Sequence, residues 1–157
     1  MSKGAPAQIE PRTLGVYLEV MSKAVFQSGM SWRVVEAKWP GFQAAFFDFV
    51  PERIARLTPK EIDALSADTR IIRNHRKIEA TVDNARTMLE LNAEHGSFRR
   101  YLRSHGGYQA TVADLKERFR FLGDTGAYVF LYVVGEEVPP HEEVMASRAP
   151  ARSRARR

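Results

Sequence analysis

Residues 75–94 read HRKIEATVDNARTMLELNAE and form the longest amphipathic stretch of the chain. Apolar residues recur along it three or four positions apart, at Ile78, Val82, Ala85, Met88 and Leu89. This spacing places side chains on one face of an α-helix. The stretch therefore predicts a central helix with one buried face.

The segments before this stretch show further helix signals, separated by short breaks. Residues 14–25 have the same spacing and predict a first helix. Ser31 can cap a second, short helix, which we expect to stop at the breaker Trp39-Pro40-Gly41. Residues 58–61 read TPKE, a capping box with proline at the first helical position, so another short helix is predicted there.

The C-terminal third continues the helical pattern. Thr111 followed by Asp114 resembles the capping start of a helix. Residues 127–134 predict a last helix, with a β-strand at Val133-Val134 as the minor alternative. We therefore expect one compact, all-α domain over residues 11–145.

The composition excludes several classes of protein. The chain has no cysteine, which rules out disulfides and thiolate metal sites, and its four histidines lack the paired spacing of metal ligands. We therefore expect no metal and no cofactor. The chain also lacks a G-x-S-x-G turn, a P-loop and a dinucleotide fingerprint. Without an apolar signal core or roughly 20 consecutive apolar residues, a cytoplasmic protein with no membrane partner is expected.

The net charge of +5 comes from the end of the chain. Five arginines lie within residues 146–157, and without them 19 basic residues balance 19 acidic ones. A segment rich in alanine, arginine, serine and proline is typical of disorder. We predict a disordered basic tail at residues 146–157 with weak phosphate affinity, and a flexible N-terminus at residues 1–10.

The folded part has one dense cationic cluster, at the start of the central helix. Its members are Arg70, Arg73, His75, Arg76 and Lys77. Neighbouring cations repel one another unless an anion neutralises them, so contact with DNA phosphates at Arg73, His75, Arg76 and Lys77 is predicted. A solvated helix start is the alternative.

Three ordered motifs carry a family resemblance. They are QSGMSW at residues 27–32, IIRNHRKI at 71–78 with NAR at 84–86, and FRFLGDT at 119–125. In order and spacing, the chain resembles the DNA-3-methyladenine glycosylase I family. The resemblance implies a compact helical domain of the helix-hairpin-helix DNA glycosylase type, which removes damaged bases by base flipping.

The resemblance also implies roles for individual residues. It places Trp32 at the base pocket and Met30 at the wedge that fills the gap in the base stack, and Gln27 can hydrogen-bond a base edge. Core positions at a helix junction are the alternative. The turn with Gly123 and Thr125 suits a DNA phosphate, the alternative being an ordinary helix start capped by Thr125 or Asp124.

The chain departs from the family where chemistry is expected. Ala24 occupies the position of the family's base-contacting glutamate, and Glu19 corresponds to a different glutamate of the same helix. The aromatic N-terminal segment and the zinc site of the family are absent. Asp48 or Glu36 is a candidate for a replacement carboxylate.

These observations favour a monofunctional glycosylase of base-excision repair that acts on alkylated purines such as 3-methyladenine by hydrolysing the N-glycosidic bond. The expected partner is damaged duplex DNA, bound by a monomer in the cytoplasm, or at the nucleoid in a bacterium. A catalytically inactive DNA-binding protein on the same scaffold is the alternative, and an interaction protein without DNA affinity is a third.

Overall fold

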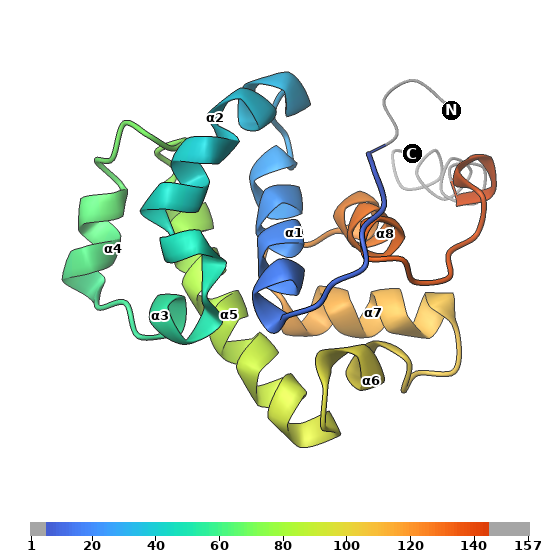
Figure 1. The fold of residues 1–157 in the computed structure, drawn as a ribbon. Helices are drawn as coiled ribbons and strands as arrows, with labels where there is room; N and C mark the ends of the chain where they lie inside the picture. The colour runs from blue at the N-terminus through green and yellow to red at the C-terminus, as the bar shows by residue number, and fades with distance from the viewer. Residues whose placement is uncertain (1–5, 145–157) are drawn as a thin grey trace, which may run out of the picture.

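The computed structural model describes residues 6–144, and this part of the chain is all-α (Figure 1). Within this range the elements are α1 (Leu14–Gln27), α2 (Trp32–Ala45), the 3-10 turn η1 (Phe47–Phe49), α3 (Pro51–Ala55), α4 (Pro59–Leu65), α5 (His75–His95), α6 (Phe98–Leu102), α7 (Tyr108–Arg118) and α8 (Asp124–Val133). The minor strand alternative at Val133-Val134 is wrong, because Val133 is the last residue of α8 and Val134 is its C-cap. The predicted tail at residues 146–157 lies outside the described residues.

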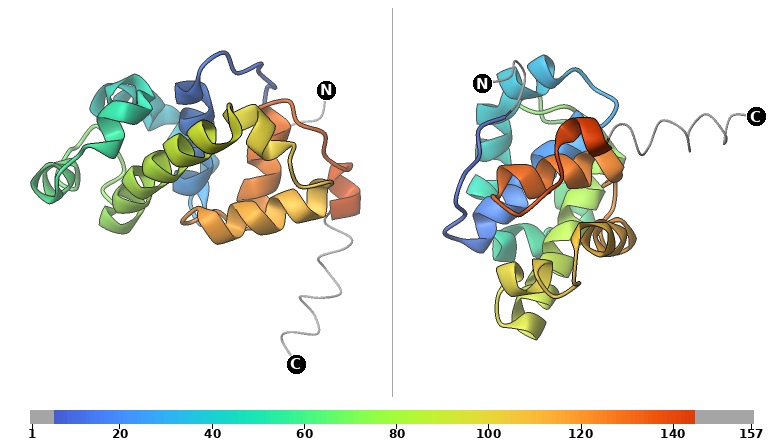
Figure 2. Two further views of the ribbon diagram at one scale, coloured as in Figure 1. Left: turned by 90° about the horizontal axis from the view of Figure 1, so that it is seen from below. Right: turned by 90° about the vertical axis from the view of Figure 1, so that its right-hand side faces the viewer.

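Helices α1 and α5 join the two sides of the molecule. Helix α1 packs against α2, α5 and α8. Helix α5 contacts α3, α4 and α6 in addition to α1. Figure 1 shows α2, α3 and α4 on one side of α1, with α6, α7 and α8 on the other, and the view from below in Figure 2 keeps this division. The predicted central helix is therefore confirmed as α5.

The structure confirms the predicted capping box at the start of α4, and it shows a cap at the start of α5 that the sequence pattern did not predict. At α4, the backbone N–H of Glu61 donates to Thr58 Oγ1 at 3.2 Å, and the Thr58 N–H donates to Glu61 Oε1 at 2.9 Å. At α5, the N–H of Lys77 donates to Asn74 Oδ1 at 3.1 Å. Such caps satisfy N–H groups that have no partner within the helix.

Aromatic side chains fill the core on both sides of α1. On the α2 side, the Trp39 ring stacks on Phe42 with 4.8 Å between centroids and on Phe49 with 5.4 Å. On the α8 side, Tyr17 meets Phe98 edge to face at 5.2 Å. Pairs of this geometry add to the stabilisation that burial alone provides.

Helix α2 does not stop at residues 39–41, so the predicted breaker is wrong. It continues through Pro40 to Ala45, and Ser31 at its N-cap makes no side-chain capping bond. A proline inside a helix costs about 3 kcal/mol, and the buried, stacked Trp39 ring offsets part of this. Gly41 allows a close approach, because a Cβ there would clash with the carbonyl oxygen of Arg70.

The start of α7 also differs from the prediction. The helix begins at Tyr108, after Gly107, so Thr111 lies inside it and its hydroxyl donates to the Gly107 carbonyl at 2.9 Å. Asp114 caps nothing; its Oδ2 accepts from the Tyr101 hydroxyl at 2.7 Å. Thr111 and Asp114 thus tie the first half of α7 to its neighbours.

The segment before α1 rests on α8. The N–H of Ile9 donates to the carbonyl of Val133 at 2.8 Å, and the Gln8 side chain donates to the carbonyl of Tyr132 at 2.9 Å. These two residues belong to the predicted flexible N-terminus, whose residues 1–5 lie outside the described part. Among residues 6–144, no helix is both long and apolar enough to cross a membrane.

Candidate functional site

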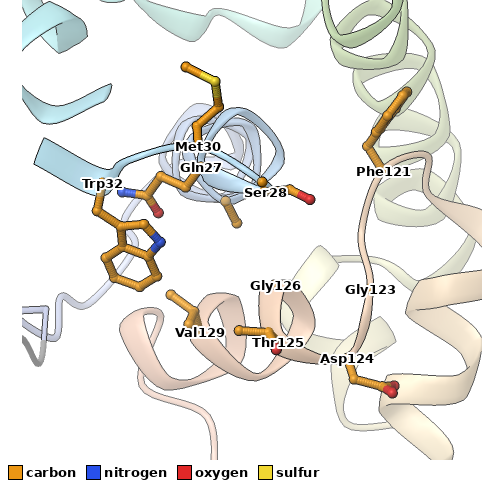
Figure 3. Close-up of a pocket in the computed structure, with 12 residues that line it drawn as sticks. Gln27, Ser28, Met30, Trp32, Phe121, Gly123, Asp124, Thr125, Gly126 and Val129 are labelled. Carbon is orange, nitrogen blue, oxygen red and sulfur yellow. The ribbon is translucent and has the colours of Figure 1, made fainter. Parts of the chain in front are cut away.

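A cavity of about 500 Å³, here called the outer cavity, opens between the α1–α2 turn and the start of α8 (Figure 3). Five of the sequence-predicted site residues line it: Gln27, Met30, Trp32, Gly123 and Thr125. The first three come from one wall and the last two from the opposite wall. The fold therefore brings together the two groups that the sequence motifs predict separately.

The start of α5 packs against the α1–α2 turn and forms hydrogen bonds with it. The Lys77 side chain is 6% exposed, and its amine donates to the backbone carbonyls of Ser28 at 2.6 Å and Phe26 at 3.2 Å. Burial lowers the pKa of Lys77. Gly29 completes the turn with a φ of +71°, a conformation that glycine adopts without strain.

Three large apolar side chains are exposed around the outer cavity. Met30 is 38% exposed, and Trp32 and Phe121 are each 40% exposed. Figure 3 shows Met30 and Phe121 on opposite sides of the opening, with Trp32 turned towards α8. Phe121 has a φ of +58°, a left-handed conformation that costs a residue other than glycine about 1–3 kcal/mol.

Sequence reasoning missed Phe121. Its available signal was its place immediately before Leu122-Gly123 in the FRFLGDT motif.

Helix α8 begins at the wall of the outer cavity. Gly123 is its N-cap, with no side-chain capping bond, so the alternative of a Thr125 or Asp124 cap is wrong. Asp124 instead forms an ion pair with Lys116, at 2.8 Å between Nζ and Oδ1. This pairing neutralises the carboxylate beside a helix start, whose partial positive charge suits a phosphate.

The predicted cationic cluster divides into surface and interior members. Arg73 and Arg76 are exposed, and neither forms an ion pair within the described part of the chain. His75 Nδ1 lies 2.8 Å from Ser66 Oγ. Lys77 points inward, as described above. The two arginines are therefore the members best placed for a polyanion, whereas Lys77 holds the turn.

A second cavity of about 590 Å³, here called the inner chamber, adjoins the outer cavity. Helices α1, α2 and α8 line it together with part of residues 6–9. The two cavities share four lining residues: Ala24, Gln27, Trp32 and Val129. Both tryptophans of the protein, Trp32 and Trp39, line the inner chamber. Its volume lies in the range of small-molecule sites.

Polar side chains of α1 and α2 face each other in the inner chamber. Trp39 Nε1 and Gln43 Nε2 each donate to Glu19 Oε2 at 2.8 Å. Lys23 forms an ion pair with Glu36, and its Nζ lies 5.4 Å from the centroid of the Trp39 ring. Burial lowers the pKa of Lys23, and the charge of Glu19 partly opposes that shift.

The candidate carboxylates occupy different places. Glu36 lines the inner chamber, whereas Asp48 lies in η1 and lines neither cavity. Ala24 is buried at the boundary between the cavities. Sequence reasoning missed the position of Glu19 in the inner chamber; the available signal was the spacing of Glu19 and Lys23, two charged residues four positions apart on a helix that is otherwise largely apolar.

The sequence model of the methyladenine glycosylase family matches residues 14–117, well over half of the chain. The chain belongs to the methyladenine glycosylase family. Among its relatives, DNA-3-methyladenine glycosylase of Haemophilus influenzae is 30% identical over 130 residues, covering 69% of this chain and 70% of that protein. DNA-3-methyladenine glycosylase 1 of Escherichia coli is 28% identical over 130 residues, which again cover 69% of this chain and 70% of that protein.

Solved structures of methyladenine glycosylases have the same fold. One 3-methyladenine DNA glycosylase I superposes with a TM-score of 0.72 at 28% identity, covering 81% of both chains. The enzyme from Staphylococcus aureus gives a TM-score of 0.72 at 25% identity, covering 82% of this chain and 80% of that one. A further similar structure is a complex with 3-methyladenine. The predicted family and the predicted all-α glycosylase fold are therefore confirmed.

Proposed function

We propose that this protein is a base-excision repair glycosylase that removes alkylated purines such as 3-methyladenine from duplex DNA. The observation that carries the proposal is the outer cavity, where exposed apolar side chains surround an opening next to Trp32 in a chain of the methyladenine glycosylase family. The protein acts as a monomer in the cytoplasm, or at the nucleoid in a bacterium.

The site suits a nucleotide that has left the base stack. Met30 and Phe121 are the side chains that enter the duplex and occupy the gap, because both are apolar and exposed at the opening. Trp32 offers a stacking surface for the extruded base, and Gln27 a hydrogen-bonding amide at its edge. The start of α8 and the arginines Arg73 and Arg76 hold the backbone phosphates.

The chemistry needs little acid–base help from the protein. A purine alkylated at N3 is cationic, so it departs as a neutral base when the bond from its nitrogen to the sugar C1′ breaks. The electron pair of that bond goes to the base; water then adds to the sugar cation at C1′ and gives up a proton to the solvent, which leaves a hydroxyl group there. A pocket that binds the cationic nucleotide more tightly as the bond stretches lowers the barrier.

A catalytically inactive DNA-binding protein is the second candidate, and Ala24 is the observation in its favour. Two findings favour the enzyme instead. The similar curated proteins carry glycosylase names. The inner chamber also provides carboxylates, at Glu19 and Glu36, beside the position that alanine occupies.

The test is single-turnover release of 3-methyladenine from alkylated duplex DNA, with spontaneous depurination subtracted. Replacing Trp32 with alanine should abolish release and leave duplex affinity unchanged, because the stacking surface is lost and the phosphate contacts remain. Val34→Ala is the matched control, since Val34 is exposed on the same helix but lines neither cavity. Full activity of Trp32→Ala would remove Trp32 from the pocket; no release by the wild type would favour the inactive binder.

A further inference from the structure

The inner chamber carries a net negative charge. Of the described residues that line it, three are charged: Glu19, Lys23 and Glu36. Lys23 and Glu36 neutralise each other in an ion pair, so the charge of Glu19 remains. Glu19 is half-buried, so water screens its charge less than that of a fully exposed carboxylate, which strengthens its attraction for a cation.

Glu19 is held in one orientation with one oxygen available. Both hydrogen bonds from Trp39 and Gln43 go to Oε2. Among residues 6–144, no hydrogen bond reaches Oε1. A carboxylate whose geometry is fixed before binding loses little conformational freedom when a ligand arrives.

Ala24 leaves room between the two cavities. It lies at their boundary with Gln27, Trp32 and Val129, and its side chain ends at Cβ. A longer side chain at this position would fill part of the space where the two cavities meet. With only a methyl group there, we expect a flat ring that passes Trp32 to reach the part of the chamber that contains Glu19 and Trp39.

We propose that Glu19 is the carboxylate that binds the extruded base, and that the inner chamber selects purines carrying a positive charge. This inference rests on the proposed function. Oε1 of Glu19 accepts a hydrogen bond from the exocyclic amino group of the base, and the unneutralised carboxylate attracts the charge of the alkylated ring. A neutral purine of the same shape gains the hydrogen bond but lacks the charge attraction.

Binding of free 3-methyladenine tests the contact directly. Tryptophan fluorescence is a suitable signal, because both tryptophans line the chamber. Glu19→Gln keeps a side-chain oxygen for Trp39 and Gln43 but places an amide NH2 group, which cannot accept a hydrogen bond, where Oε1 meets the amino group of the base, so affinity should fall about tenfold or more. Glu90→Gln, on the exposed side of α5, is the matched control and should bind as the wild type does. Equal affinity of the wild type and Glu19→Gln would overturn the contact.

A second variant changes the charge in the opposite direction. Lys23→Gln leaves both carboxylates unneutralised, so single-turnover release of 3-methyladenine from the cationic nucleotide in duplex DNA should become about threefold faster or more. A folding defect cannot produce a faster reaction, which separates this result from damage to the fold. Release that is no faster than that of the wild type would overturn selection by charge.

The wild-type reaction distinguishes this inference from the function on which it rests. If the wild type releases 3-methyladenine and Glu19→Gln releases it at the same rate, the role of Glu19 is wrong and the glycosylase stands. If the wild type releases no base but binds free 3-methyladenine through Glu19, the enzyme is wrong and the recognition site stands.

Discussion

Lys77 shows that a lysine in a cationic cluster can bind backbone carbonyls inside the protein instead of phosphates at its surface. In the sequence it belongs to a run of cations, and that run predicts phosphate contact. In the structure its amine lies under the α1–α2 turn and donates to the carbonyls of Phe26 and Ser28. The pattern of charges alone does not distinguish these roles, because the carbonyl partners lie about 50 residues away in the chain.

Replacing Lys77 with methionine should therefore destabilise the protein. Methionine fills similar space but leaves two inward-facing carbonyls without their donor, which should lower the free energy of unfolding by about 2 kcal/mol. Urea unfolding followed by circular dichroism measures this change. Lys60→Met, at an exposed position of α4, is the control. Equal stability of the two variants would show that the buried amine contributes nothing to the turn.

At the scale of elements, periodicity predicts helices well and breakers poorly. The apolar spacing of residues 75–94 identifies α5 because a long helix repeats its buried face several times. Pro40 fails as a stop signal because the stacked Trp39 and the close contact of Gly41 with Arg70 keep α2 helical on both sides of it. Local propensity predicts the break, and tertiary packing overrides it.

Phe121, in the turn before α8, tests whether a strained backbone conformation is kept because its side chain contacts DNA. Phe121 is exposed and left-handed, so Phe121→Gly should keep or raise the unfolding temperature, since glycine adopts this φ without strain. Single-turnover base release should nevertheless fall about tenfold, because an apolar side chain that enters the duplex is lost. A variant with a lower unfolding temperature and unchanged release would show that Phe121 serves the fold alone.

At the scale of the whole molecule, the site forms only when distant segments pack together. The motifs predict Gln27, Met30 and Trp32 on one wall and Gly123 and Thr125 on the other, and all five line one cavity. The inner chamber was not predictable in this way. Its Glu19–Trp39 contact depends on how α1 and α2 cross, and no motif in the sequence encodes that crossing.

Arg73 and Arg76 should determine much of the salt dependence of DNA binding. Each phosphate contact contributes about 0.9 to the slope of log affinity against log salt. Replacing both arginines with alanine should therefore reduce the slope by about 2 and weaken binding to all sequences alike. The control is Arg56→Ala with Lys60→Ala, two exposed cations that line neither cavity. An unchanged slope would exclude the arginines from the interface.

The segment before α1 has a consequence for product release. Pro6, Ala7 and Ile9 form part of the wall of the inner chamber, and Gln8 and Ile9 attach this wall to the end of α8 through one hydrogen bond each. Because so few hydrogen bonds hold this segment, it should separate from α8 far more often than the helices themselves unfold. We therefore expect a free base in the chamber to leave here without passing back through the DNA, and loosening Ile9 from Val133 to hasten turnover without altering the bond-breaking step.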